Sequence, residues 1–319
     1  MTAYTASNGA IAADLTALKA IPSTSLPTSG FVVLFVTAEN NWFEYNPALT
    51  SGDATPSDNP STGRWLRIGR DKLTANRTYY VRTDGSDSNT GLANTSGGAF
   101  LTIPKVVDVV ASLDISIYNV SIRVGAGTYT APITLKSITG SGTVTLRGDN
   151  NDNTSTIISV TGADAIGGYF DGKYVIEYLK IQTTTSGACI AAEGFVTFGN
   201  LNFGSCAGAQ IVLASSKSQY RCYSPYTISG GAVQYHIACL RGGFIEVAFT
   251  TITLTGTPNF TQGFIWSAYC AQVLYYANTI SGGASGSAYL VTLNAVLYTG
   301  GLTLPSSGAG STSTGGQVL

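Results

Sequence analysis

A pair of hydrophobic residues five positions apart recurs through the second half of the 319-residue chain, and this repeat restricts the possible folds more than any other feature. The second members of successive pairs are separated by 22, 25, 24, 28 and 23 residues. The pairs are Ile176 with Ile181, Phe198 with Phe203, Tyr223 with Ile228, Val247 with Ile252, Tyr275 with Ile280, and a degraded Tyr298 with Thr303. Most pairs run into a turn of Gly, Ser and Thr, and a second short strand follows within each unit. A period of roughly 20 to 30 residues built from short strands is typical of a β-solenoid.

The repeats are expected to stack because stacking buries the apolar face of each coil. A single coil cannot bury its own apolar face, so successive coils stack about 4.8 Å apart and equivalent residues form ladders. One predicted ladder contains Ile176, Phe198, Tyr223, Val247, Tyr275 and Tyr298, and the other contains Ile181, Phe203, Ile228, Ile252 and Ile280. Thr and Ser suit such coils because their side chains can form ladders of their own and satisfy turn amides.

The first 72 residues predict a separate small β module. Strands are expected over residues 31–36, 41–45 and 63–68, after a short helix-like segment over 14–19, with a polar loop over 50–62. Trp42 and Trp65 are its expected core.

One convincing helix is expected near Thr102 to Leu113. Thr102 can cap it, Pro104 lies in its first turn, and Ile103, Val106, Val107 and Val110 fall on one face. Short strands over residues 120–124, 133–135, 144–146 and 157–160 follow it. We therefore divide the chain into a β module (1–72), a helix with the first coils (73–170), the repeat coils (171–304) and a C-terminal tail (305–319).

Composition excludes several classes of protein. Charged residues make up only 10% of the chain, the net charge is −1, and Lys and Arg form no cluster, which argues against nucleic-acid binding. A hydrophobic content of 44% argues against disorder. No apolar run is long enough for membrane insertion, and we expect no secretory signal. The five scattered cysteines indicate buried thiols, so neither a metal nor a cofactor is predicted.

The segment before the repeat resembles a known family. Residues 79–91 and 100–107 resemble the opening of pectin-lyase-like right-handed parallel β-helix proteins, in which a strand and an Asp-Gly-rich loop lead into a capping helix. Residues 124–129 resemble the first-coil turn of that family. The leading module, with Gly63-Arg64-Trp65-Leu66-Arg67, resembles the virion-binding head of bacteriophage tailspikes and tail fibres.

The resemblance implies an all-β, right-handed parallel β-helix with a short N-terminal capping helix and a small N-terminal β head module. It also implies a homotrimer in the phage tail of the virion, assembled in the host cytoplasm. Residues 1–72 would bind phage tail or baseplate adaptor proteins, and the shaft would bind a host surface polysaccharide.

Catalysis is the less favoured interpretation. Tailspikes of this fold often cut polysaccharide, and hydrolases need two carboxylates roughly 5 to 10 Å apart. The repeat offers only Asp171, Glu177, Glu193 and Glu246. Glu177 and Glu246 lie three coils apart, which leaves Glu177 with Glu193 as the one weak pair, or a pair formed across a trimer. A receptor-binding spike is preferred, with a polysaccharide depolymerase (hydrolase or lyase) or a purely structural tail component as alternatives.

Four residues in the middle strands of neighbouring coils are the predicted ligand-binding face. Sugar recognition uses aromatic faces and neutral hydrogen-bonding groups, and the candidates are Tyr235, His236, Arg241 and Trp266. The alternative for each tyrosine is ladder or trimer packing, and for His236 a structural role.

The C-terminal coils carry no charge, since no charged residue follows Glu246. Exposed sheet edges are usually protected by charges. We therefore expect these coils to pack against their copies in a trimer, or the tail from Pro305 to fold over the edge.

Overall fold

The computed structural model describes residues 11–12, 15–26, 32–36, 41–48, 50, 52, 55–56, 62–68 and 70–319. The chain divides into two compact units. One contains Met1–Thr74 with Ser112–Asp114, and the other contains Ala75–Ala111 with Ile115–Leu319. Each unit is described by itself.

The first unit contains a four-stranded sheet in the order β1 (Ile11–Ala12), β2 (Val32–Val36), β3 (Asn41–Asn46) and β4 (Arg64–Ile68), with α1 at Leu15–Lys19. Strands β2, β3 and β4 pair antiparallel, as the alternating apolar residues indicate. The rings of Tyr45 and Trp65 lie 5.4 Å apart in a core with Leu18 and Phe43. Trp65 is confirmed as a core residue, whereas the side chain of Trp42 lies outside the described residues. Strand β5 (Asp71–Lys72) pairs with the start of β7 (Leu113–Ser116).

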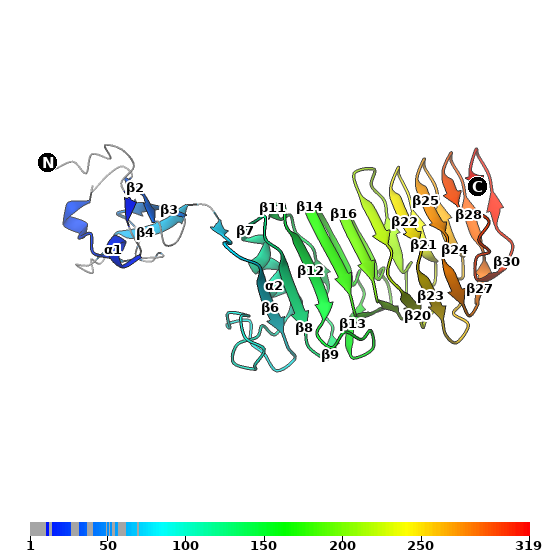
Figure 1. Ribbon diagram of the computed structural model, residues 1–319, viewed down its shortest axis with the longest axis horizontal. Coiled ribbons are helices and arrows are strands. Elements are labelled where there is room, and N and C mark those ends of the chain that lie inside the picture. The colour runs from blue at the N-terminus through cyan, green and yellow to red at the C-terminus, as the bar shows by residue number, and fades with distance from the viewer. Residues whose placement is uncertain are drawn as a thin grey trace. The chain divides into compact units, whose positions relative to one another are not determined.

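The second unit is a β-solenoid of stacked parallel strands, which confirms the predicted fold class. Figure 1 shows the strands side by side along the solenoid from β6 to β30. The central ladder contains, in order, β6 (Arg77–Val81), β8 (Val120–Val124), β12 (Thr143–Gly148), β14 (Ile166–Glu177), β16 (Ile190–Gly199), β19 (Gln219–Cys222), β22 (Phe244–Ala248), β25 (Gln272–Tyr276), β29 (Val296–Tyr298) and β32 (Gln317–Val318). Alternate residues of these strands are buried, as in β8 and β12, because successive side chains point to opposite faces.

Two further rows of strands complete the coils. One row contains β9 (Gly127–Tyr129), β13 (Thr156–Thr161), β15 (Lys180–Thr184), β17 (Asn202–Phe203), β20 (Tyr226–Ile228), β23 (Thr251–Leu254) and β26 (Thr279–Ser281). The other begins with β10 (Ile133–Thr134), passes through the first residues of β14 and β16, and continues through β18 (Ile211–Leu213), β21 (Tyr235–Cys239), β24 (Gly263–Ser267), β28 (Tyr289–Val291) and β31 (Ser311–Thr312). The short strands β10 and β11 (Thr139–Gly140) belong to the early coils. A coil with a strand in each of the three rows therefore has three sides.

The predicted helix is confirmed as α2 (Ile103–Ala111). The Thr102 hydroxyl accepts a hydrogen bond from the Lys105 amide at 3.3 Å, and Asp87 accepts one from the Thr102 amide at 2.9 Å. The predicted apolar face is buried against β6, β8 and β10. No helix in the described part of the chain is both long and apolar enough to cross a membrane.

The first predicted ladder is wrong by one residue at two positions. Cys222, not Tyr223, aligns with Val247, and Tyr298 aligns with Leu274 rather than Tyr275. A one-residue slip moves a side chain to the other face of a strand. Tyr223 and Tyr298 are accordingly 46% and 39% exposed instead of buried.

The second predicted ladder is correct apart from one shift. Ile181, Phe203 and Ile228 are in register, but Ile228 aligns with Leu254, and Ile252 aligns with Tyr226. The shift of two residues keeps these side chains in the core, because alternate residues share a face.

The C-terminal tail forms a further rung. Strands β30 (Ser306–Gly308), β31 and β32 pair parallel with β27 (Ala284–Ser287), β28 and β29. The expectation that the tail folds over the edge is therefore wrong, because its residues continue the ladder instead of crossing it.

Candidate functional site

The candidate site lies at the corner where the central ladder turns into the row containing β15, β17, β20 and β23. Residues with left-handed backbone recur at this corner, with φ of 56° at Tyr178, 51° at Asn200, 53° at Phe249 and 52° at Ala277. Non-glycine residues seldom adopt this conformation. Its recurrence in four coils, with the coil of β19 and β20 as the exception, defines a corner of similar geometry.

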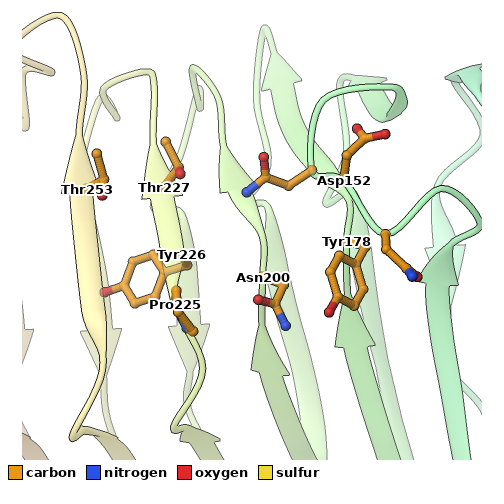
Figure 2. Close-up of a pocket in the computed structure, with 9 residues that line it drawn as sticks. Asp152, Tyr178, Asn200, Pro225, Tyr226, Thr227 and Thr253 are labelled. Carbon is orange, nitrogen blue, oxygen red and sulfur yellow. The ribbon is translucent and has the colours of Figure 1, made fainter.

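A pocket of about 230 Å³ opens at this corner. It is lined by Asn151, Asp152, Asn153, Tyr178, Asn200, Pro225, Tyr226, Thr227 and Thr253. The first three belong to the loop between β12 and β13, and the others come from successive coils. Figure 2 shows Tyr178, Asn200 and Pro225 following one another from coil to coil, with Thr227 beside Thr253.

The loop wall of the pocket is held by Asp152. One carboxylate oxygen accepts hydrogen bonds from the amides of Thr154 at 2.8 Å and Ser155 at 2.7 Å, and the other accepts from the Ser155 hydroxyl at 2.6 Å. These hydrogen bonds, first of all the one from the Ser155 side chain, lower the pKa of Asp152 to about 2. Asn153 donates to the carbonyl of Leu201 at 3.1 Å, which ties the loop to the coil.

The pocket is polar, and the one charged residue among its described lining residues is Asp152, a carboxylate held by neutral hydrogen-bond donors and not by a cation. Arg147 donates to Asn151 and forms an ion pair with Glu177 at 3.2 Å, with its guanidinium 4.9 Å from the centre of the Tyr178 ring. The charges of Arg147 and Glu177 beside the pocket are therefore paired with each other. Within the described residues, the side chains of Tyr178, Asn200, Thr227 and Thr253 make no hydrogen bond, so they are available to a ligand.

An acidic aromatic cluster occupies the same corner. Tyr223 donates a hydrogen bond to one oxygen of Glu246, and Tyr276 donates to the other at 3.3 Å. The Arg221 Nε lies 3.9 Å from Glu246, whose side chain is only 14% exposed. Desolvation is the largest cause that raises the pKa values of Tyr223 and Tyr276, and the hydrogen bond to Glu246 and its negative charge raise them further. Both phenols therefore remain protonated donors.

Exposed aromatic rings flank this cluster. Phe249 is 69% exposed and packs edge-on against Tyr276 at 5.3 Å between ring centres. Tyr276 in turn lies 5.3 Å from Tyr298. Exposed apolar patches rimmed by polar groups mark ligand or partner surfaces. Aromatic faces next to a carboxylate and phenol hydroxyls suit the C–H and hydroxyl groups of a sugar.

The three predicted glutamates are not brought together within one chain. Glu177 aligns with Gly199, which lies about 20 Å along β16 from Glu193 at roughly 3.3 Å per residue. Asp171 lies at the irregularity in β14, and Glu246 lies three strands further along the ladder. The distances between Glu177, Glu193 and Glu246 exceed those of hydrolase pairs. Asp171, by contrast, lies two residues from Tyr169, which is the register partner of Glu193 on the neighbouring strand. In the described ranges, no group of three His, Cys, Asp or Glu residues is placed to hold a metal ion.

The predicted ligand-binding face is corrected at His236. Its side chain is completely buried, with Nδ1 2.7 Å from the Gln210 Oε1 and Nε2 3.0 Å from the Tyr226 hydroxyl. His236 is therefore a core residue that a surface ligand cannot contact.

The prediction is also corrected at Tyr235, which is only 5% exposed and lies in a buried cluster with Ala209 and Ala238. Tyr235 and Trp266 stack 5.2 Å apart on the outer side of β21 and β24. Arg241 lies in the turn between β21 and β22 with φ of 54°. The structure thus brings Tyr235 and Trp266 together, away from the corner strands β22 and β25.

Tyr223, Phe249 and the pocket residues are not among the predicted site residues. Tyr223 is missed because it is assigned to the inner ladder. The strand alternation could have identified it: Tyr220 and Cys222 are two residues apart and both buried, so the residue after Cys222 points outward. The pocket carries no such signal, because its residues come from a loop and several coils.

The fold and this corner define a parallel β-solenoid with a polar, aromatic-flanked groove.

No family model matches the chain, and no curated protein matches it. Among solved structures, the tailspike protein gp49 of Acinetobacter baumannii bacteriophage Fri1, described as a capsular polysaccharide depolymerase, matches 97% of this chain and 69% of its own. The two are 12% identical with a TM-score of 0.27, a likeness that carries no functional inference.

Proposed function

We propose that the protein is a tailspike-like, receptor-binding component of a phage virion that attaches to a bacterial surface polysaccharide. The observation that carries this proposal is the corner, where exposed rings flank a carboxylate held by Tyr223 and Tyr276. The resemblance of the leading module, with Gly63-Arg64-Trp65-Leu66-Arg67, to the virion-binding head of phage tailspikes and tail fibres supports the virion location. Residues 1–72 would then bind tail or baseplate adaptor proteins after assembly in the host cytoplasm.

We further propose a homotrimer. Val212, Ala238, Trp266 and Leu290 lie in register on the outer side of β18, β21, β24 and β28, and this row has no charged residue. The indole nitrogen of Trp266 is buried with no hydrogen-bond partner in the described structure. An apolar row with an aromatic anchor is typical of the centre of a protein interface.

Trp266→Glu is expected to convert the trimer to a monomer, because a charge in an apolar interface loses its hydration without gaining a partner. Molar mass in solution at about micromolar concentration measures this. Tyr269→Glu, in the turn after β24 where Tyr269 is exposed, is the matched control and should remain trimeric. A wild-type monomer, or a Trp266→Glu variant that stays trimeric, would contradict the trimer.

Glu246→Gln is expected to weaken polysaccharide binding by roughly tenfold, because it removes the charge that both phenols and a ligand hydroxyl share. Binding to surface polysaccharides from a bacterial panel measures this, with Glu193→Gln as the control outside the corner. Release of new reducing ends or unsaturated sugars would favour a depolymerase instead. Failure to bind any bacterial surface would favour a structural tail component.

A further inference from the structure

We propose that the corner pocket binds a neutral acetamido sugar, an N-acetylhexosamine residue of the receptor glycan. This inference rests on the proposed function, because it names the sugar that the glycan presents to the corner. The pocket and the aromatic cluster share the turn between β19 and β20, which contains both Tyr223 and Pro225. One glycan chain can therefore contact both.

The size of the pocket selects a single sugar unit. Its volume of about 230 Å³ is below the roughly 300 to 1,000 Å³ of pockets that enclose drug-sized ligands. The loop carrying Asn151, Asp152 and Asn153 closes one side, and the coil residues form the other. A sugar residue with one substituent fills such a space, whereas a longer segment has to continue along the corner.

The negative charge of Asp152 in the pocket lining disfavours an anionic ligand. The Asp152 carboxylate accepts hydrogen bonds from the Thr154 and Ser155 amides and hydroxyls, and Arg147 is held by Glu177 and Asn151. The carboxylate of a uronic acid would lie beside the Asp152 carboxylate, and the nearby Arg147 is already occupied. Placing an unpaired charge in such a site is unfavourable.

The remaining lining matches an acetamido group. The Asn200 amide can both donate and accept, and the Thr227 and Thr253 hydroxyls can do the same. The three follow one another on successive coils, with Asn200 between Tyr178 and Pro225 (Figure 2). An acetamido group has one N–H donor, one C=O acceptor and a methyl group. The amide and hydroxyls satisfy the first two, and the Pro225 ring with the threonine methyls accommodates the third.

The test measures binding of N-acetylglucosamine, N-acetylgalactosamine, glucose and glucuronic acid to the full chain by saturation-transfer NMR and calorimetry. At least one N-acetylhexosamine is expected to bind about tenfold more tightly than glucose, which lacks the amide hydrogen bonds. Glucuronic acid is expected not to bind.

Two variants locate this binding in the pocket. Asn200→Gly removes the amide while glycine retains the left-handed backbone, and Thr227→Val removes only a hydroxyl. Each is expected to weaken acetamido-sugar binding about tenfold. Asn294→Gly, an exposed turn residue with φ of 58°, is the matched control and should bind as the wild type.

The outcomes separate the two proposals. The acetamido inference is overturned if bacterial polysaccharide binds but N-acetylhexosamines bind no better than glucose. It is also overturned if Asn200→Gly and Thr227→Val bind N-acetylhexosamines as tightly as the wild type. In both cases the proposed glycan binding stands. If neither polysaccharide nor any sugar binds the folded protein, the proposed function fails and this inference with it.

Discussion

Phe203→Ala is expected to lower the free energy of unfolding by about 3 to 5 kcal/mol, as for other buried phenylalanines. Phe203 is fully buried between coils, with its ring centre 5.8 Å from that of Tyr226 and 5.6 Å from that of His236. Truncation leaves a cavity that the neighbouring rings cannot fill without leaving their own contacts. Because each coil of a solenoid is stabilised by its neighbours, the loss affects the coils on both sides.

Phe249→Ala is the matched control, because the chemical change is the same and the ring is largely exposed. Its free energy of unfolding is expected to stay within about 0.5 kcal/mol of the wild type. Polysaccharide binding, by contrast, should weaken, since the ring flanks Glu246 through Tyr276. Equilibrium denaturation of both variants measures the difference. Equal destabilisation by the two truncations would show that the assigned inward and outward faces are wrong.

Acidification from pH 8 to pH 5 is expected to destabilise the folded chain by about 2 kcal/mol through His236 alone, at about 1.4 kcal/mol per pKa unit. Burial lowers the pKa of His236 to about 3 in the folded state. In the unfolded chain it titrates near 6.5. Between these values the unfolded state binds a proton that the folded state does not, so stability falls as the pH decreases below 6.5 and levels off below about 3.

The surroundings of His236 explain why it stays neutral. Gln210 donates its amide hydrogens to the carbonyls of Gly204 at 3.0 Å and Gly230 at 2.7 Å, so its oxygen faces Nδ1, which must carry the proton. Nε2 then accepts from the Tyr226 hydroxyl. The other neighbours are the rings of Phe203, Phe260 and Phe264. No carboxylate is among these contacts to stabilise a second proton.

The chain has one histidine, so this pH dependence can be assigned without ambiguity. His236→Gln should lower stability at pH 8 but remove the slope between pH 8 and pH 5. Denaturant unfolding at several pH values measures both quantities. A wild-type slope that survives in His236→Gln would place the titration elsewhere.

The positions of the elements could be predicted because the evidence for each is local. The helix at Ile103–Ala111 is defined by its cap and by an apolar face of regular period. The solenoid is defined by a repeat that several coils share, so a wrong residue alignment in one coil does not change the predicted fold. The inner ladder from Ile181 to Phe203 and Ile228 follows directly from that repeat.

The candidate site could not be predicted in the same way. Whether Tyr223 or Cys222 enters the core depends on how many residues form the corner, and a difference of one residue reverses the face. The sequence pattern allows both alignments. Packing of Cys222 against Val247 decides between them and leaves Tyr223 free to contact Glu246.

By itself the sequence determined the solenoid, its capping helix and the uncharged C-terminal coils, because burial of apolar faces and chain periodicity are properties of neighbouring residues. Only the tertiary structure decided what lies at the corner. Asp152 and Thr253 lie four coils apart along the chain but line the same pocket. His236, a predicted ligand residue, is buried among aromatic rings. The physical reason is that stacking joins residues from different coils, and their alignment depends on turn lengths that no single segment of sequence encodes.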